Sequence, residues 1–133
     1  MNVTRLAALL GFVGVALGAF GAHGLRTRVG PEMIEVWKTA VLYQLVHALA
    51  LLALGLAPGR AGWRRAVAGL WTAGVVLFSG SLYGLVLVGA RWLGPITPLG
   101  GVAFMAGWAV LFFFCGTAAG DGAKRSAGPP TTP

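Results

Sequence analysis

The sequence predicts an all-α integral membrane protein, a bundle of four transmembrane helices. Hydrophobic residues make up 57% of the 133-residue chain and charged residues only 10%, whereas a soluble domain has about 25% charged residues. The mean hydropathy is +0.82. The charges separate four uncharged runs, at residues 6–25, 39–57, 66–90 and 92–120. Crossing about 30 Å of hydrocarbon takes roughly 17–25 apolar residues in a helix, so each run can span a bilayer.

One transmembrane domain is expected over residues 1–120, with helices at about 5–25, 31–57, 64–90 and 96–119. Residues 121–133 are rich in Gly, Pro and Thr and are predicted to be a disordered tail. Arg5, the first apolar run and the small residues that end it also resemble a cleavable signal peptide. The run is longer than the apolar core of about 7–15 residues in such peptides, which favours a retained helix.

The connections predict where the later helices begin. Gly30 and Pro31 precede two glutamates, a combination typical of a helix start. We expect a short interfacial helical turn there that runs directly into the second span, with Trp37 near the headgroups. Residues 58–62 (Pro-Gly-Arg-Ala-Gly) predict a tight turn, and the prolines within residues 94–98 break the chain before the fourth helix.

The basic residues indicate orientation and exclude nucleic acid as a partner. They lie in short clusters between apolar runs, without the basic helix or aromatic–basic pattern of a nucleic-acid groove. With four spans, six basic residues share the side of the termini and four lie opposite, diluted by two glutamates. Positive charge favours the cytoplasm. We therefore expect a multi-pass protein of a bacterial-type inner (plasma) membrane with both termini in the cytoplasm.

Small residues in the first span predict a helix-packing face. They follow a spacing of 4, 3, 4 and 3, which places them in one seam on a helix: Ala7, Gly11, Gly14, Gly18 and Gly21. Two further glycine pairs have the GxxxG spacing, Gly80 with Gly84 and Gly116 with Gly120. Small residues let membrane helices approach closely. The seam can serve packing inside the bundle or a homodimer, and the sequence does not separate the two.

Polar residues within the spans form a candidate ligand-binding pocket. Tyr43, Gln44 and His47 lie within about one turn of the second span, so they form a stripe. The third span adds Ser79, Ser81 and Tyr83, and a histidine ends the first. The proposed ligand-binding set is His23, Tyr43, Gln44, His47, Ser79 and Tyr83. For His23 the alternative is that it caps the first helix or lines the entry to the loop. The alternative is purely structural, because such side chains often hydrogen-bond between helices, at about 0.6 kcal/mol per contact.

The chain lacks the residue combinations of catalytic and cofactor sites. No Asp or Glu lies within an apolar run, so ion-coupled transport through a buried carboxylate has no carrier. Two histidines and the lone Cys115 fall short of the four ligands of a zinc site. His23 and His47 fall at different depths, which disfavours haem. We expect no catalytic residue, metal or cofactor, and no enzyme.

Four motifs together resemble a known family. They are LGAFGAHGL at 17–25, WKTAVLYQLVHALA at 37–50, FSGSLY at 78–83 and TPLGG at 97–101. In register, they are similar to the small membrane proteins catalogued as DUF 423 or UPF 0382, with bacterial YgdD-type and mitochondrial transmembrane-protein-256-type members. The resemblance covers residues 4–118. It implies a four-helix inner-membrane protein, draws attention to the same polar residues, and implies no reaction.

Two functions from different classes follow. The first is a non-enzymatic packing component that acts in the lipid bilayer as a homodimer or as an accessory or assembly subunit of a larger membrane complex. The glycine seam, the lack of buried charge and the small size favour it. The alternative is a small binding or transport protein that uses the His/Tyr/Gln pocket for a small or lipid-like ligand.

Overall fold

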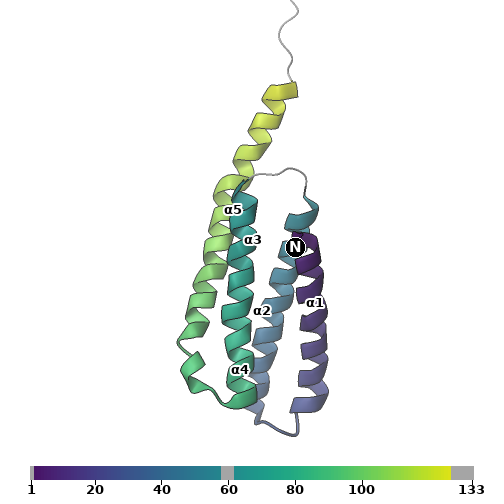
Figure 1. Cartoon of the computed structure of the whole chain (residues 1–133), viewed down its shortest axis with the longest axis vertical. Coiled ribbons are helices and arrows are strands. Elements are labelled where there is room, and N and C mark those ends of the chain that lie inside the picture. Colours follow the sequence, from purple (N-terminus) through teal and green to yellow (C-terminus); the bar gives the residue numbers. More distant parts are fainter. Residues whose placement is uncertain (1, 58–61, 127–133) are drawn as a thin grey trace, which may run out of the picture.

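The computed structural model describes residues 2–57 and 62–126, and the regular elements in this part of the chain are all helical (Figure 1). The first span is α1 (Val3–Phe20) and the π-helical η1 (Gly21–Leu25), and the second is α2 (Pro31–Leu56). The third joins α3 (Gly62–Gly74), the π-helical η2 (Val75–Ser79) and α4 (Gly80–Val88). The 3-10 turn η3 (Arg91–Leu93) leads into α5 (Ile96–Ser126). Among the described residues, four helical segments are long and apolar enough to cross a membrane, which confirms the predicted four-helix class.

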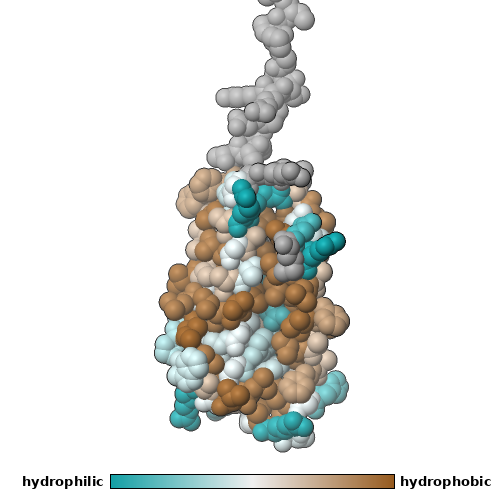
Figure 2. All heavy atoms as spheres, in the orientation of Figure 1, coloured by the Kyte–Doolittle hydropathy of each residue, from teal (hydrophilic) through white to brown (hydrophobic). Residues whose placement is uncertain are grey.

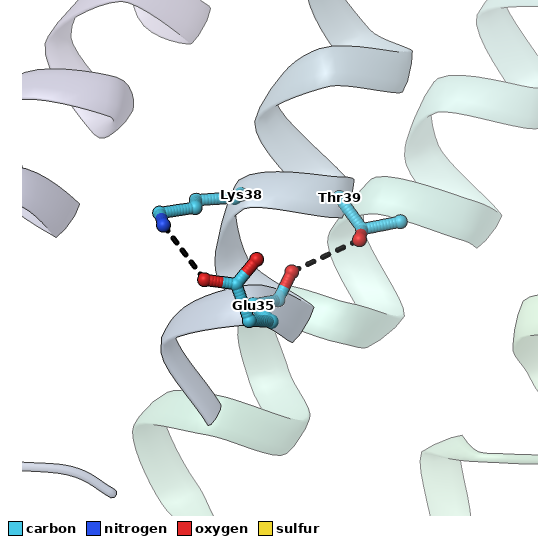
Figure 3. A network of polar contacts seen from close by, with 3 residues as sticks. All are labelled: Glu35, Lys38 and Thr39. Carbon is cyan, nitrogen blue, oxygen red and sulfur yellow. Dashed lines mark hydrogen bonds and ion pairs between the residues drawn. The ribbon is translucent and has the colours of Figure 1, made fainter. Parts of the chain in front are cut away.

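Local chemistry explains where the second span starts and the third ends. Gly30 is extended before Pro31, so α2 begins at the proline and continues unbroken through the predicted interfacial turn. Near this start, Lys38 pairs with Glu35 at 2.7 Å, and the Thr39 hydroxyl donates to the Glu35 carbonyl at 2.9 Å (Figure 3). The third span ends at Val88, two residues before the predicted end. Gly89 takes the left-handed conformation (φ 64°) that terminates helices.

The C-terminal prediction needs correction. The last helix continues to Ser126, so residues 121–126, predicted as the start of a disordered tail, are helical. Alanine, lysine and arginine in this stretch are good helix formers, and a helix that is already nucleated propagates through them. Residues 127–133 lie outside the described part of the chain, as do residues 58–61 of the predicted turn.

The bundle consists of two helix pairs. The first helix packs chiefly against α2, and α3 packs chiefly against α5, while η2 and α4 bring the second pair onto α2. One buried cluster joins all four spans, and it contains Ala7, Leu51, Leu54, Val67, Ala68, Trp71, Val75 and Phe104. A smaller cluster of Leu25, Trp37 and Val86 lies near the other end. The bundle therefore has an apolar core along its length.

The outer surface is also apolar. Large side chains such as Phe12 (75% exposed) and Phe112 (80% exposed) point away from the bundle. Figure 2 shows hydrophobic residues over most of the middle of one face and hydrophilic residues gathered at its two ends. Continuous apolar exposure is unfavourable in water and natural against lipid tails. The folded chain therefore has the surface of a membrane-spanning bundle.

Candidate functional site

Gln44 links three helices at the centre of the predicted polar set. Its side-chain nitrogen donates to the Leu10 carbonyl of α1 at 2.8 Å, and its side-chain oxygen accepts from the Tyr83 hydroxyl of α4 at 2.9 Å. Gly14 makes the first bond possible, since a Cβ there would lie 2.7 Å from Leu45 and 3.3 Å from the Gln44 nitrogen. A predicted seam glycine and a predicted polar residue thus form one contact.

His47 is hydrogen-bonded through both ring nitrogens. Nδ1 lies 2.8 Å from the Tyr43 carbonyl, and Nε2 lies 3.2 Å from the indole nitrogen of Trp108 on α5. A carbonyl can only accept and an indole N–H can only donate, so this geometry assigns the neutral ring with its proton on Nδ1. The imidazole also stacks on Phe104, with ring centroids 3.6 Å apart. His47 therefore joins α2 to α5.

The two serines also bond between helices. The Ser79 hydroxyl donates to the Ala40 carbonyl at 2.8 Å, and this serine is 1% exposed. Ser81 lies 2.9 Å from the Phe78 carbonyl and 2.7 Å from the Thr97 hydroxyl at the start of α5. If Ser81 donates to the carbonyl, Thr97 donates to Ser81, and both hydroxyls are satisfied. Ser79 is the last residue of the π-helical η2, and short π-helical turns inside α-helices are frequently found at functional sites.

The predicted pocket does not form as one unit. His23 is exposed, and its Nδ1 lies 3.1 Å from the Ala19 carbonyl one turn earlier, so it joins none of the other polar residues. The Tyr43 ring is 41% exposed and packs on Phe78 at the bundle surface, with ring centroids 4.5 Å apart. The structure brings Gln44 to Tyr83 and leaves His23 outside. His23 thus lies on the exposed side of the π-helical η1, where it bonds to the last turn of the first helix, as in the alternative to a shared pocket.

Tryptophans supply contacts that the sequence analysis missed. Trp37, expected near the headgroups, is 1% exposed and donates from its indole nitrogen to the Leu17 carbonyl at 2.8 Å. Gly21 admits this ring, since a Cβ there would lie 2.4 Å from it. A buried indole N–H usually finds a hydrogen-bond acceptor. The sequence signal for this buried tryptophan was the glycine seam on the facing helix, which leaves room for a large ring. Trp37 is therefore a buried anchor between α1 and α2.

The glycines divide into packed and open positions. Gly14, Gly18 and Gly21 lie against α2, and Gly84 lies against Leu93, so these predicted packing glycines work inside the bundle. The predicted positions Gly11 and Gly80 differ, because a Cβ at either would meet no described atom within 4 Å. Three glycines that were not predicted bring α5 against α3 and η2: Gly74, Gly100 and Gly107. The partner of each is an aromatic residue, Phe104, Phe78 and Trp71 respectively.

The buried polar residues are held in place by hydrogen bonds within the bundle. Gln44, His47, Ser79, Ser81 and Tyr83 each bond to another residue, and five of these bonds cross between helices. None of these polar residues lines the hollow between α1 and α3 or the hollow beside the connection between the first and second spans. Within residues 2–57 and 62–114, no three His, Cys, Asp or Glu side chains gather as metal ligands would. The arrangement is suited to fixing helices relative to one another.

Comparison with known proteins places the chain among membrane proteins. Residues 17–101 match the family described as "Protein of unknown function (DUF423)". Over 113 residues, the chain is 45% identical to the UPF0382 membrane protein SAB0533 of Staphylococcus aureus, and the match covers 80% of this chain and 88% of that protein. Over 115 residues, it is 44% identical to the UPF0382 membrane protein YwdK of Bacillus subtilis, with 80% of this chain and 89% of that protein covered. Over 119 residues, it is 41% identical to the UPF0382 membrane protein C1782.12c of Schizosaccharomyces pombe, with 84% of this chain and 98% of that protein covered. No solved structure matches the chain.

Proposed function

We propose that this chain, which belongs to the DUF423 family of UPF0382 membrane proteins, is a non-enzymatic packing component that assembles with other membrane helices. In this role the bundle presents its lateral faces to a second copy or to the subunits of a larger complex. It carries out no reaction itself. Its environment is a bacterial-type inner membrane.

One observation carries the proposal. Every buried side chain of Gln, His or Ser in the described spans makes at least one hydrogen bond within the bundle. The buried indole N–H of Trp71 is the exception, with no partner among the described residues. A group that binds a ligand or moves a proton must be free to bond to it, and breaking an internal bond first adds to the free energy of binding. The binding or transport alternative therefore requires the Gln44 and His47 contacts to open. An assembly role leaves them closed.

The outer faces supply the means of assembly. Lipid tails are as apolar as the side chains, so helices associate in a bilayer by close packing over small residues. Gly11 on α1 and Gly80 on α4 have room for a side chain that the bundle itself does not fill. Each lies among outward-facing apolar residues, such as Phe12 beside Gly11. A partner helix can approach at these positions more closely than elsewhere.

The test is the size of the particle in a native-like bilayer. The full chain is extracted directly into polymer nanodiscs and its mass compared with the 13.6 kDa monomer. We expect a discrete larger particle, which Gly11→Leu or Gly80→Leu dissociates without changing the stability of the bundle. The matched control is Val15→Leu on α1. Val15 is 64% exposed, and because it is not a small residue, its replacement by leucine removes no close-packing position. A wild-type protein that always emerges as a monomer would refute the assembly role.

The proposed orientation places both termini in the cytoplasm. Arg5, Arg64 and Arg65 lie where α1 and α3 begin, and the opposite end combines its basic residues with Glu32 and Glu35. Excess Lys and Arg mark the cytoplasmic side. Reporter fusions at the C-terminus and after residue 28 test this. A fluorescent C-terminal fusion with an active periplasmic phosphatase fusion at 28 is expected, and the reverse pattern would overturn the assignment.

A further inference from the structure

An apolar groove runs between α1 and α3 at the end of the bundle where both helices begin. Its volume is about 650 Å³, within the roughly 300–1,000 Å³ typical of ligand sites. Val3 and Leu6 form one wall, and α3 with η2 forms the other through Arg65, Gly69, Ala73 and Val76. The groove exists because α1 packs on α2 and α3 packs on α5, which leaves α1 and α3 without close packing against each other.

Small residues on α3 keep the groove open. A Cβ at Gly69 would meet no described atom within 4 Å, so no side chain from the rest of the bundle fills this space. One helical turn later, Ala73 is also exposed and small. The groove wall is therefore almost entirely hydrocarbon, with the hydroxyl of Thr72 turned back to bond the Ala68 carbonyl at 2.7 Å.

A single positive charge lines the groove. The guanidinium of Arg65 is exposed and has no hydrogen bond or ion pair with any described residue. Its neighbour Arg64 is committed elsewhere, since it donates to the carbonyls of Leu54 and Ala57 and so caps the end of α2. Arg5 lies at the same end, whereas Glu32 and Glu35 lie at the start of α2, at the opposite end. The groove therefore attracts an anion.

The longer wall of the groove has about the length of one leaflet. Val76 lies eleven positions after Arg65, so at 1.5 Å per residue the wall formed by α3 and η2 extends about 16 Å, whereas the α1 wall runs from Val3 to Leu6. Half of a hydrocarbon core of about 30 Å is about 15 Å. A transmembrane helix of a second copy would need a seat along the full thickness of the bilayer. A lipid tail from one leaflet needs only this half.

We infer that this groove binds one phospholipid with an anionic headgroup. Its acyl chain lies along Gly69, Ala73 and Val76, and its phosphate lies against the Arg65 guanidinium. Basic pockets between transmembrane helices on the cytoplasmic side are typical sites for anionic headgroups. The inference does not depend on the proposed assembly role, because a monomer can hold the lipid equally well.

Native mass spectrometry of the full chain tests the inference. The protein is purified in mild detergent with equal amounts of phosphatidylglycerol and phosphatidylcholine carrying the same acyl chains. We expect one retained phospholipid per chain, with about a fivefold preference for phosphatidylglycerol, the factor that one basic residue contributes near an anionic surface. Arg65→Gln should remove the preference. Gly69→Leu should remove retention of both lipids, because leucine fills the groove.

Two further variants make every outcome decisive. Arg91→Gln removes a charge at the opposite end, so the preference should survive, and an equal loss in this control would mean nonspecific attraction and overturn the inference. Ala73→Leu fills the same groove from the next turn and replaces Gly69→Leu should that variant misfold. Unchanged retention in a folded groove-filling variant would refute the site. A groove-filling variant that only dissociates a dimer would assign the groove to a second copy instead.

Discussion

Replacing Gln44 by leucine should destabilise the bundle through two identifiable bonds. The side chain bonds to the Leu10 carbonyl and to the Tyr83 hydroxyl. Interhelical hydrogen bonds in membranes average about 0.6 kcal/mol, so two such bonds contribute about 1.2 kcal/mol. The Leu10 carbonyl keeps its place in the helical ladder, but the hydroxyl of the half-buried Tyr83 loses its acceptor, which adds about 1 kcal/mol, the low end of the range for an unsatisfied group. We expect Gln44→Leu to lower the free energy of unfolding by about 2 kcal/mol.

A double-mutant cycle isolates the shared bond. Reversible unfolding in mixed lipid–detergent micelles is followed for Gln44→Leu, Tyr83→Phe and the double variant. We expect a coupling energy of about 0.6–1.7 kcal/mol, because the second substitution removes the hydroxyl that the first left unpaired. Ser81→Ala combined with Gln44→Leu is the control and should be additive, since Ser81 bonds to other residues. Additive effects for the first pair would refute the structural role given to these groups.

Three further predictions concern packing and one buried hydroxyl. Gly100→Ala should destabilise the protein by about 1–3 kcal/mol, since its Cβ would meet backbone of η2 at 2.3 Å, whereas Gly101→Ala, with nothing within 4 Å, should be neutral or slightly stabilising in thermal unfolding. Gly21→Ala should shift the tryptophan emission spectrum, because the new Cβ would lie 2.4 Å from the Trp37 ring and must displace it. Gly11→Ala should leave the spectrum unchanged, because its Cβ meets no described atom within 4 Å. Ser79→Ala should lower the free energy of unfolding by about 0.6 kcal/mol through loss of its bond to α2, and a larger loss of more than about 2 kcal/mol would show that η2 itself depends on this serine.

The sequence predicted the spans well because hydrocarbon thickness sets the length of a span and charge marks its ends. The helix start at Pro31 followed from one local signal, a proline after an extended glycine. The end of the last helix was missed, because residues past an apolar run still follow intrinsic helix propensity. Neither π-helical segment was predicted, since no composition signal distinguishes them from α-helix.

The candidate site was predicted in part. Spacing on one helix placed Gln44 and His47 together, and equal depth brought Tyr83 to Gln44. What spacing cannot give is the rotation of one helix against another. That rotation moved His23 outward and turned Tyr43 to the surface, and it put Trp108, which no motif marked, onto His47. The glycines that bring α5 against α3 and η2 were missed for the same reason: Gly74 and Gly107 each face an aromatic ring on the neighbouring helix, and Gly100 faces the backbone of Phe78.

The placement of the polar contacts has a consequence for biogenesis. The bonds of Ala40, Gln44 and His47 to Ser79, Tyr83 and Trp108 connect the first two spans to the last two. While only the first hairpin has left the ribosome, the side-chain oxygen of Gln44 and Nε2 of His47 face hydrocarbon without their partners on α4 and α5. We expect them to be shielded by the insertion machinery until the second hairpin arrives and seals the bundle. Chains stalled with a C-terminal tether that fills the exit tunnel test this order. Crosslinking should show contact between α2 and the insertase when the exposed part of the chain ends near residue 60, and release once α5 is also exposed; no difference between the two lengths would contradict this order.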